Sequence, residues 1–210
     1  FGSSQGRRGC TAAAPFPPMA IDEPFASLAT EQPSELAAES KAVQACEVRT
    51  HAMTRRLARE FADLFPGHDL NAEPHVVITL ALQTQHRQTA RTAEMMDERQ
   101  QLMALLVRRM AAFKERCDAA GRWCDFIDPF TGAPFHSSSA TTFTECDEPY
   151  RNLGFEILEL GCCRAICCKT FGQCVVVTTA FVCASETEVS PDLKLLEEDA
   201  EQGVSSQRLL

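Results

Sequence analysis

Two uninterrupted apolar runs constrain the fold more than any other part of the sequence. Residues 75–82 read HVVITLAL, and residues 174–184 read CVVVTTAFVCA. Continuous β-branched and aliphatic runs of this kind are typical of strands that are buried in a sheet. Both runs are far shorter than the roughly 20 residues that a membrane-spanning helix needs, so we expect no membrane partner.

A helical pattern predicts a long helix over residues 98–120. Its apolar stripe consists of Leu102, Leu106, Met110, Phe113 and Cys117. Asp97 before this stripe and Gly121 after it fit the two ends of a helix. The basic residues on the opposite side are interpreted as a solvated face and are Arg99, Arg108, Arg109 and Lys114.

A shorter helix is expected after residue 40, ending near Phe65, because Leu57, Phe61 and Leu64 recur at helical spacing before Pro66-Gly67. Near the other end of the chain, residues 156–160 read as an edge element. Residues 162–168 and 174–184 are predicted to pair as a hairpin, joined through residues 169–173.

Composition divides the chain into three parts. Residues 1–40 are rich in Gly, Ala, Ser and Pro and are predicted to be disordered. Residues 41–185 are expected to form one α+β domain, and the acid-rich residues 186–210 a disordered, solvated tail. The net charge of −9 argues against a nucleic-acid partner, which would require a basic face.

The cysteines are the strongest chemical signal. There are eleven, an odd number without the even spacing of a secreted disulfide scaffold, so a reducing compartment is expected. Residues 161–168 read GCCRAICC and contain two vicinal pairs. From the residues alone, this segment could supply a thiolate ligand, a thiol redox pair, or a zinc or iron–sulfur site.

Other candidate groups are weaker. Asp125 and Asp128 could form a catalytic carboxylate pair, but their spacing at a turn fits hydrogen bonding equally well. His75 and His86 have no second ligand at short spacing and are interpreted as surface or capping histidines. The Gly- and Ser-rich loop over residues 131–139 is retained as a site candidate because long ordered loops often carry function.

Five motifs, in order along the chain, resemble one family. They are residues 64–66 (LFP), 123–129 (WCDFIDP), 147–155 (DEPYRNLGF), 160–163 (LGCC) and 175–177 (VVV). Together they resemble the CblD family of cobalamin trafficking proteins over residues 46–185. The resemblance implies a nitroreductase-like α+β fold, an antiparallel sheet flanked by helices, without flavin and without enzymatic activity.

The resemblance also implies a function. Proteins of this family are adaptors that engage the cobalamin-processing protein CblC. They direct the cofactor to methionine synthase in the cytosol and to methylmalonyl-CoA mutase in the mitochondrion. By analogy, cobalamin is expected to be shared with a CblC-type partner rather than bound by this chain alone.

The resemblance assigns candidate residues as well. Cys162, the first cysteine of the Gly-Cys-Cys motif, is expected to donate a thiolate to cobalt, with Cys163 as the secondary candidate. Asp147, Tyr150 and Leu160 are expected to face the partner. Cys167 and Cys168 depart from the family pattern and have no assigned role. Two other classes remain open, a flavin-dependent reductase and a thiol redox or metal-binding protein.

Overall fold

The computed structural model describes residues 45–161 and 163–198, which all fall in one compact unit spanning Ser40–Leu210. The elements are β1 (Cys46–Ala52), α1 (Arg55–Glu60), the 3-10 turn η2 (Ala62–Leu64), β2 (His75–Gln83), α2 (Ala93–Ala119), β3 (Cys124–Phe126), α3 (Pro149–Asn152), β4 (Glu156–Glu159), β5 (Arg164–Cys167), β6 (Val175–Cys183) and α4 (Glu186–Glu198). None of the helices in this described part combines the length and apolar character needed to cross a membrane.

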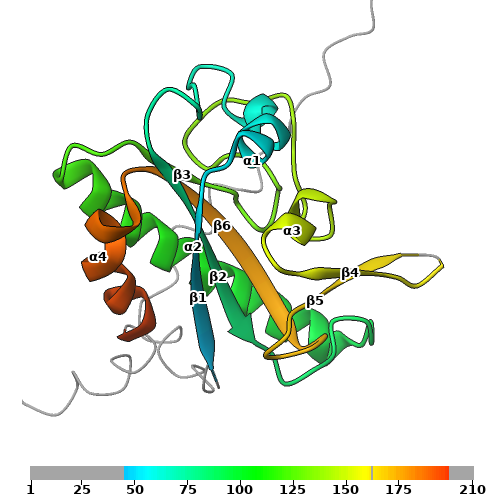
Figure 1. Cartoon of the computed structure of the whole chain (residues 1–210). Helices are drawn as coiled ribbons and strands as arrows, with labels where there is room; N and C mark the ends of the chain where they lie inside the picture. Colours follow the sequence, from blue (N-terminus) through cyan, green and yellow to red (C-terminus); the bar gives the residue numbers. More distant parts are fainter. Residues whose placement is uncertain (1–44, 162, 199–210) are drawn as a thin grey trace, which may run out of the picture. The chain divides into compact units, whose positions relative to one another are not determined.

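A four-stranded antiparallel sheet in the order β1-β2-β6-β3 organises the fold (Figure 1). Its two central strands, β2 and β6, are the two apolar runs of the sequence, and they pair along their full lengths from His75 opposite Cys183 to Gln83 opposite Val175. All but the last residue of each strand are buried. The predicted buried strands and the predicted α+β class are therefore confirmed, whereas the nitroreductase likeness stays a prediction.

Each face of the sheet has its own core, because successive side chains of a strand point to opposite faces. On one face, Ile78 and Leu80 of β2 pack with Leu106 and Phe113 of α2. On the other face, the core is built from the α1, η2, α3 and β4–β5 segments against Phe181 of β6. The sheet thus separates a helical layer from a layer of short elements and loops.

The long helix α2 begins five residues before the predicted start at residue 98. Its N-cap is Thr92, whose hydroxyl accepts a hydrogen bond from the backbone N–H of Met95 at 3.3 Å, so the prediction of Asp97 as the cap is wrong. Gly121 ends the helix as predicted, with φ +69°, a backbone conformation that favours glycine. Arg109 is also a correction, because it is 5% exposed rather than part of a solvated face.

Two segments differ from their predicted structure. The helix expected after residue 40 is preceded by β1, which pairs with β2, and only Arg55–Glu60 and η2 are helical. The acidic segment that follows residue 185 is not wholly a disordered tail, because Glu186–Glu198 forms α4 and buries Val189 and Leu196 against the helical layer. Residues 1–44, which include the whole N-terminal segment predicted to be disordered, and residues 199–210, the last part of the predicted acidic tail, lie outside the described residues.

Candidate functional site

The cysteine segment belongs to a separate hairpin formed by β4 and β5 (Figure 1). The strands pair from Glu156 opposite Cys167 to Glu159 opposite Arg164. The predicted pairing of residues 162–168 with 174–184 is therefore wrong, since β6 pairs instead with β2 and β3. As a result, the Gly-Cys-Cys motif lies at the connection between the two strands, not along a central strand.

The hairpin closes at the motif itself. The backbone N–H of Leu160 donates to the carbonyl of Cys163 at 2.9 Å, and only Gly161 and Cys162 lie between them in the sequence. Gly161 has φ +80°, which a residue with a side chain adopts only with strain. Cys162, the expected cobalt ligand, lies outside the described residues. Cys163, the secondary candidate, is half-buried.

The base of the hairpin is anchored, while its tip is exposed. Ile157 and Ile166, opposite one another in the register, are both buried in the core beneath the hairpin. Leu160 is 43% exposed, and Gly161 is exposed as well. A single exposed leucine is common on protein surfaces, so the role of Leu160 as a contact residue stays a prediction.

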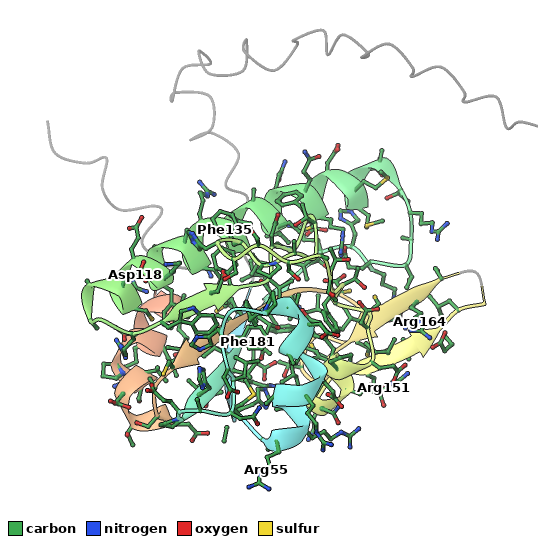
Figure 2. All side chains as sticks on the ribbon, turned by 90° about the horizontal axis from the view of Figure 1, so that it is seen from above. Arg55, Asp118, Phe135, Arg151, Arg164 and Phe181 are labelled. Atoms are coloured by element: carbon green, nitrogen blue, oxygen red, sulfur yellow. The ribbon has the colours of Figure 1, made fainter. Side chains whose placement is uncertain are left out.

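Charged side chains surround the hairpin (Figure 2). The Arg164 guanidinium lies 3.0 Å from the Glu159 carboxylate and 4.0 Å from that of Glu148. Arg151 also pairs with Glu148, at 2.8 Å, and donates to the carbonyl of Ile157 at 2.9 Å. The positive charge nearest the motif is therefore balanced by carboxylates.

Of the three residues expected to face a partner, Tyr150 is a correction. Its side chain is 1% exposed, and its hydroxyl lies 3.4 Å from that of Thr179 inside the sheet-side core. Burial raises the pKa of this tyrosine. Asp147 is partly exposed, and its carboxylate accepts hydrogen bonds from the backbone N–H and the hydroxyl of Thr144, at 2.6 and 3.1 Å. Asp147 thus shapes the turn that leads into α3.

The structure shows the surroundings of Cys167 and Cys168, the two cysteines without an assigned role. The Cys168 sulfur is buried and accepts a hydrogen bond from the backbone N–H of Phe171 at 3.1 Å, so this side chain stabilises the turn after β5. Burial and the nearby Glu156 raise the pKa of the Cys167 thiol, which disfavours its thiolate form. Within residues 45–161 and 163–198, no group of three or more histidine, cysteine and acidic side chains converges closely enough to hold a metal ion.

The two aspartates of the WCDFIDP motif support a loop. Asp125 is 1% exposed, and its carboxylate accepts hydrogen bonds from the backbone N–H groups of Phe126, His136 and Ser137. Asp128 accepts from the backbone N–H of Phe130 at 3.0 Å. This arrangement favours the hydrogen-bonding interpretation of the pair over the catalytic one.

The loop retained as a site candidate borders a cavity of about 300 Å³. Residues 129–132 form one wall, while Arg99 of α2 and Glu145 form another. The guanidinium of Arg99 and the carboxylate of Glu145 lie 2.6 Å apart, so the two charged side chains that line the cavity pair with each other.

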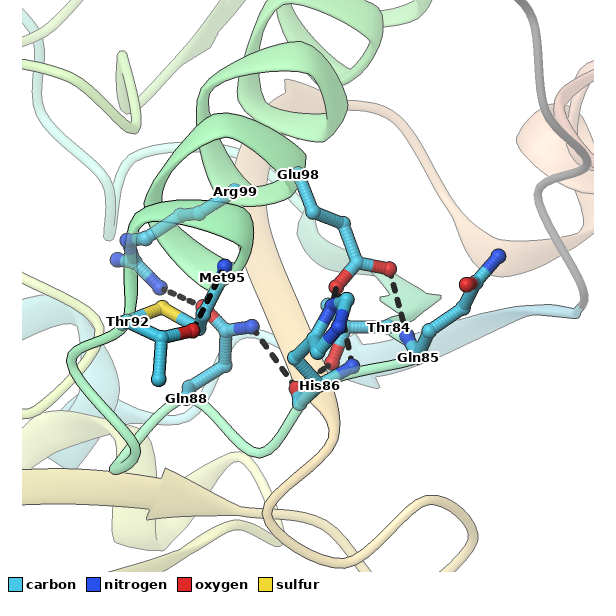
Figure 3. A network of polar contacts seen from close by, with 8 residues as sticks. All are labelled: Thr84, Gln85, His86, Gln88, Thr92, Met95, Glu98 and Arg99. Carbon is cyan, nitrogen blue, oxygen red and sulfur yellow. Dashed lines mark hydrogen bonds and ion pairs between the residues drawn. The ribbon is translucent and has the colours of Figure 1, made fainter.

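His86 lies in a polar network at the start of α2 (Figure 3). The Glu98 carboxylate accepts from the His86 ring nitrogen Nδ1 at 2.8 Å and from the backbone N–H groups of Gln85 and His86. This network joins the end of β2 to the first turns of α2. His86 therefore has a structural partner, in line with its interpretation as a capping histidine.

His75 lies in a second cluster that the sequence did not reveal. It is buried rather than on the surface, with its Nε2 atom 2.7 Å from the Nε2 atom of His68, and the His68 ring stacks on Trp123 at 3.7 Å. These rings border a cavity of about 410 Å³ together with Cys183 and Glu73. The Cys183 thiol donates to the Glu73 carboxylate at 2.9 Å, and burial together with that carboxylate raises its pKa to about 11.

Comparisons with known proteins identify relatives across most of the chain. A family model described as methylmalonic aciduria and homocystinuria type D protein matches residues 21–194. A chicken (Gallus gallus) protein named cobalamin trafficking protein CblD is 34% identical over 159 residues, which cover 74% of this chain and 48% of the relative. Proteins of the same name from rat (Rattus norvegicus) and human (Homo sapiens) are 37% identical over 133 residues and 31% identical over 141 residues; the matches cover 61% and 67% of this chain and 43% and 45% of the relatives. The chain thus spans about half the length of these curated relatives.

Proposed function

The chain belongs to the methylmalonic aciduria and homocystinuria type D protein family, and on this basis we propose that it acts as an adaptor in intracellular cobalamin trafficking. The proposed role is non-catalytic and without flavin. The chain receives access to cobalamin through a CblC-type partner and does not bind the cofactor by itself. The observation that carries the proposal is the family match, which includes the Gly-Cys-Cys motif at the hairpin connection.

The proposed contact with the cofactor is a bond between sulfur and cobalt. Cys162 would supply its thiolate as a ligand to cobalt, after its thiol has lost a proton to solvent. The hydrogen bond between Leu160 and Cys163 supports this role, because it places the ends of the motif at a tight connection beyond the anchored base. A connection of this kind can reach a cofactor that is enclosed by another protein.

Nearby charge does little to favour the thiolate. Arg164 is already paired with Glu159 and Glu148, and Lys169 lies after the far end of β5. The partner that presents the cofactor must then supply most of the driving force for deprotonation, through cobalt itself. This supports a thiol that reacts only in the complex.

The proposed partner-facing surface is the tip of the hairpin with the Asp147 turn. Leu160 supplies exposed apolar area, and Asp147 holds the turn before α3. Tyr150 contributes from inside, by supporting this surface rather than contacting the partner. From the family we further propose action in the cytosol and the mitochondrion, with methionine synthase and methylmalonyl-CoA mutase as destinations.

The visible absorption spectrum of cobalamin tests the proposal. The chain is titrated into a CblC-type protein loaded with cobalamin, and also into cobalamin alone. A spectral change is expected only when the partner is present. The Cys162→Ala variant is expected to abolish the change, and the Cys163→Ala variant is expected to keep most of it.

The matched cysteine variants separate ligation from folding, because each removes one sulfur from the same Gly-Cys-Cys motif. Identical spectra for the original chain and Cys162→Ala would refute the ligand assignment. A Leu160→Ala variant tests the contact surface separately, and we expect weaker association with the partner but the same spectrum at saturation. A yellow purified protein would instead favour the flavin-dependent reductase.

A further inference from the structure

The proposed function leaves unused the cavity between α2 and the loop over residues 127–132. This cavity of about 300 Å³ lies beyond the end of β3, which pairs only with residues 180–182 of β6, and Val177 of β6 forms part of its wall. None of the described residues that line it belongs to the β4–β5 hairpin. A ligand in this cavity would therefore occupy a site separate from the Gly-Cys-Cys motif.

The loop wall of the cavity is held by short backbone hydrogen bonds. The N–H of Gly132 donates to the carbonyl of Asp128, and the N–H of Phe143 donates to the carbonyl of Gly132, both at 2.7 Å. A side chain at Gly132 would not fit, because its Cβ would lie 2.6 Å from the carbonyl oxygen of Phe143. The position of this wall is therefore fixed by its own contacts.

The lining combines buried apolar side chains with a single ion pair. Met103, Ile127 and Val177 are all buried. Arg99 and Glu145 are the only charged side chains among the described lining residues, and they lie 2.6 Å apart. Arg99 also donates to the side-chain carbonyl of Gln88 at 3.1 Å, which orients its guanidinium. The cavity thus offers one positive and one negative group beside an apolar surface.

Hydrogen-bonding capacity remains inside the cavity. The side chain of Glu145 is 12% exposed, and its Oε2 atom lies 3.4 Å from the backbone nitrogen of Val177, a long and therefore weak contact. The Tyr150 hydroxyl also lines the cavity. It accepts from the Thr179 hydroxyl at 3.4 Å, and its own hydrogen finds no acceptor in the described part of the chain.

We propose that this cavity binds a free α-amino acid with an apolar side chain. Such a molecule carries a carboxylate and an ammonium group on the same carbon atom, so its two charges are adjacent, as are those of Arg99 and Glu145. The ligand carboxylate accepts from the Arg99 guanidinium, and the ligand ammonium donates to the Glu145 carboxylate. The ligand side chain contacts the apolar lining.

A ligand with both charges suits this ion pair better than a ligand with one. Separating Arg99 from Glu145 in a largely enclosed site costs free energy unless each group meets a new opposite charge. A carboxylic acid without an amine would leave Glu145 unpaired, and an amine without a carboxylate would leave Arg99 unpaired. The volume is at the lower end of the roughly 300–1,000 Å³ of ligand pockets, which favours a single amino acid over a larger molecule.

Isothermal titration calorimetry of the full chain with L-leucine tests the proposal. One molecule is expected to bind per chain. N-acetyl-L-leucine lacks the ammonium group, L-leucinamide lacks the carboxylate, and glycine lacks the apolar side chain. Each is expected to bind more weakly than L-leucine by about tenfold or more. No binding of L-leucine at millimolar concentration, or equal binding of any of the three analogues, would overturn the proposal.

Variants at the ion pair then locate the site. The Arg99→Gln/Glu145→Gln variant removes both charges and is expected to weaken L-leucine binding by about tenfold or more. The control variant Arg108→Gln/Glu115→Gln removes the same two charges at exposed positions of α2 and should leave the affinity unchanged.

Unchanged affinity in the Arg99→Gln/Glu145→Gln variant would place the binding elsewhere and overturn the site. The unfolding temperature of each variant shows whether it is folded. If the ion-pair variant does not fold, the comparison of L-leucine with its three analogues on the original chain still decides the proposal.

Discussion

His68 and His75 form a pair whose rings are hydrogen-bonded to each other. The Nδ1 atom of His75 lies 2.8 Å from the Glu73 carbonyl and must carry a proton to donate to it. The Nε2 atom of His75 then accepts from His68, so the neutral pair is fully hydrogen-bonded between the two rings.

The free energy of unfolding should decrease in mild acid. Burial and the charge of His75 lower the pKa of His68, and burial and Arg49 lower that of His51. Histidines of the unfolded chain, with pKa near 6.5, take up protons first, so the free energy of unfolding is highest above about pH 6.5 and falls below it. Urea unfolding at pH 7.5, 6.5 and 5.5 measures this dependence. His68→Gln should flatten it, and an unchanged slope would contradict the assignment.

The burial of some side chains could be predicted from the sequence, and that of others could not. The pattern placed Phe113 and Ile78 in the core correctly, because apolar periodicity reports which side of an element is buried. It could not place Tyr150 or Arg109. Both are amphipathic, and whether such a side chain points inward depends on tertiary neighbours that are distant in sequence. The resemblance supplied the position of Tyr150 in a motif but not its direction.

The start of α2 provides a test at the scale of an element. Thr92→Ala removes the hydroxyl that accepts from the Met95 backbone N–H and should lower the free energy of unfolding by about 1 kcal/mol. Asp97→Ala lies within the helix and is exposed, so it should change stability by less than about 0.5 kcal/mol. Chemical denaturation measures the free energy of unfolding of both variants. A larger decrease for Asp97→Ala than for Thr92→Ala would support Asp97 as the N-cap, as the sequence predicted.

The hairpin explains why strand pairing was harder to predict than strand existence. Residues 162–168 precede β6 closely, and adjacent strands often pair, so the wrong partner was chosen. β4 and β5 have only four residues each, so buried positions such as Ile157 and Ile166 carry little information on register, and Gly161 with φ +80° lies at the turn between them. The Gly-Cys-Cys motif is evident in the sequence, but its place at the connection between two strands required the structure.

β1 and α4 were missed for different reasons. In β1, Val48 and Thr50 alternate with Glu47, Arg49 and His51, a two-residue period that could have been recognised. In α4, acidic residues dominate the composition, and only Val189, Leu193 and Leu196 carry the helical spacing that packs against the helical layer. A sparse apolar stripe among charges is easily taken for a solvated tail.

At the scale of the whole molecule, the two sheets should differ in stability. Amides of the central strands β2 and β6 are buried between two cores, whereas the β4–β5 hairpin has only two strands and an exposed tip. Hydrogen exchange should therefore be slowest in β2 and β6 and faster by about two orders of magnitude or more in the hairpin. Exchange measured by mass spectrometry resolves these segments. If the hairpin amides were protected as strongly as those of β2 and β6, the hairpin would not open separately from the central sheet, and the prediction would be wrong.

The pairing of β2 with β6 also determines when the molecule can be completed. The two strands lie about a hundred residues apart in the chain, and each leaves the backbone hydrogen bonds of one edge unmade until the other is present. During synthesis on the ribosome, β1 and β2 emerge early. The edge of β2 that pairs with β6 in the finished fold stays unpaired until most of the remaining chain has been synthesised. During that interval the nascent protein exposes an unpaired strand edge that is prone to aggregation. Its folding yield should therefore depend on chaperones that cover β2 until β6 is synthesised.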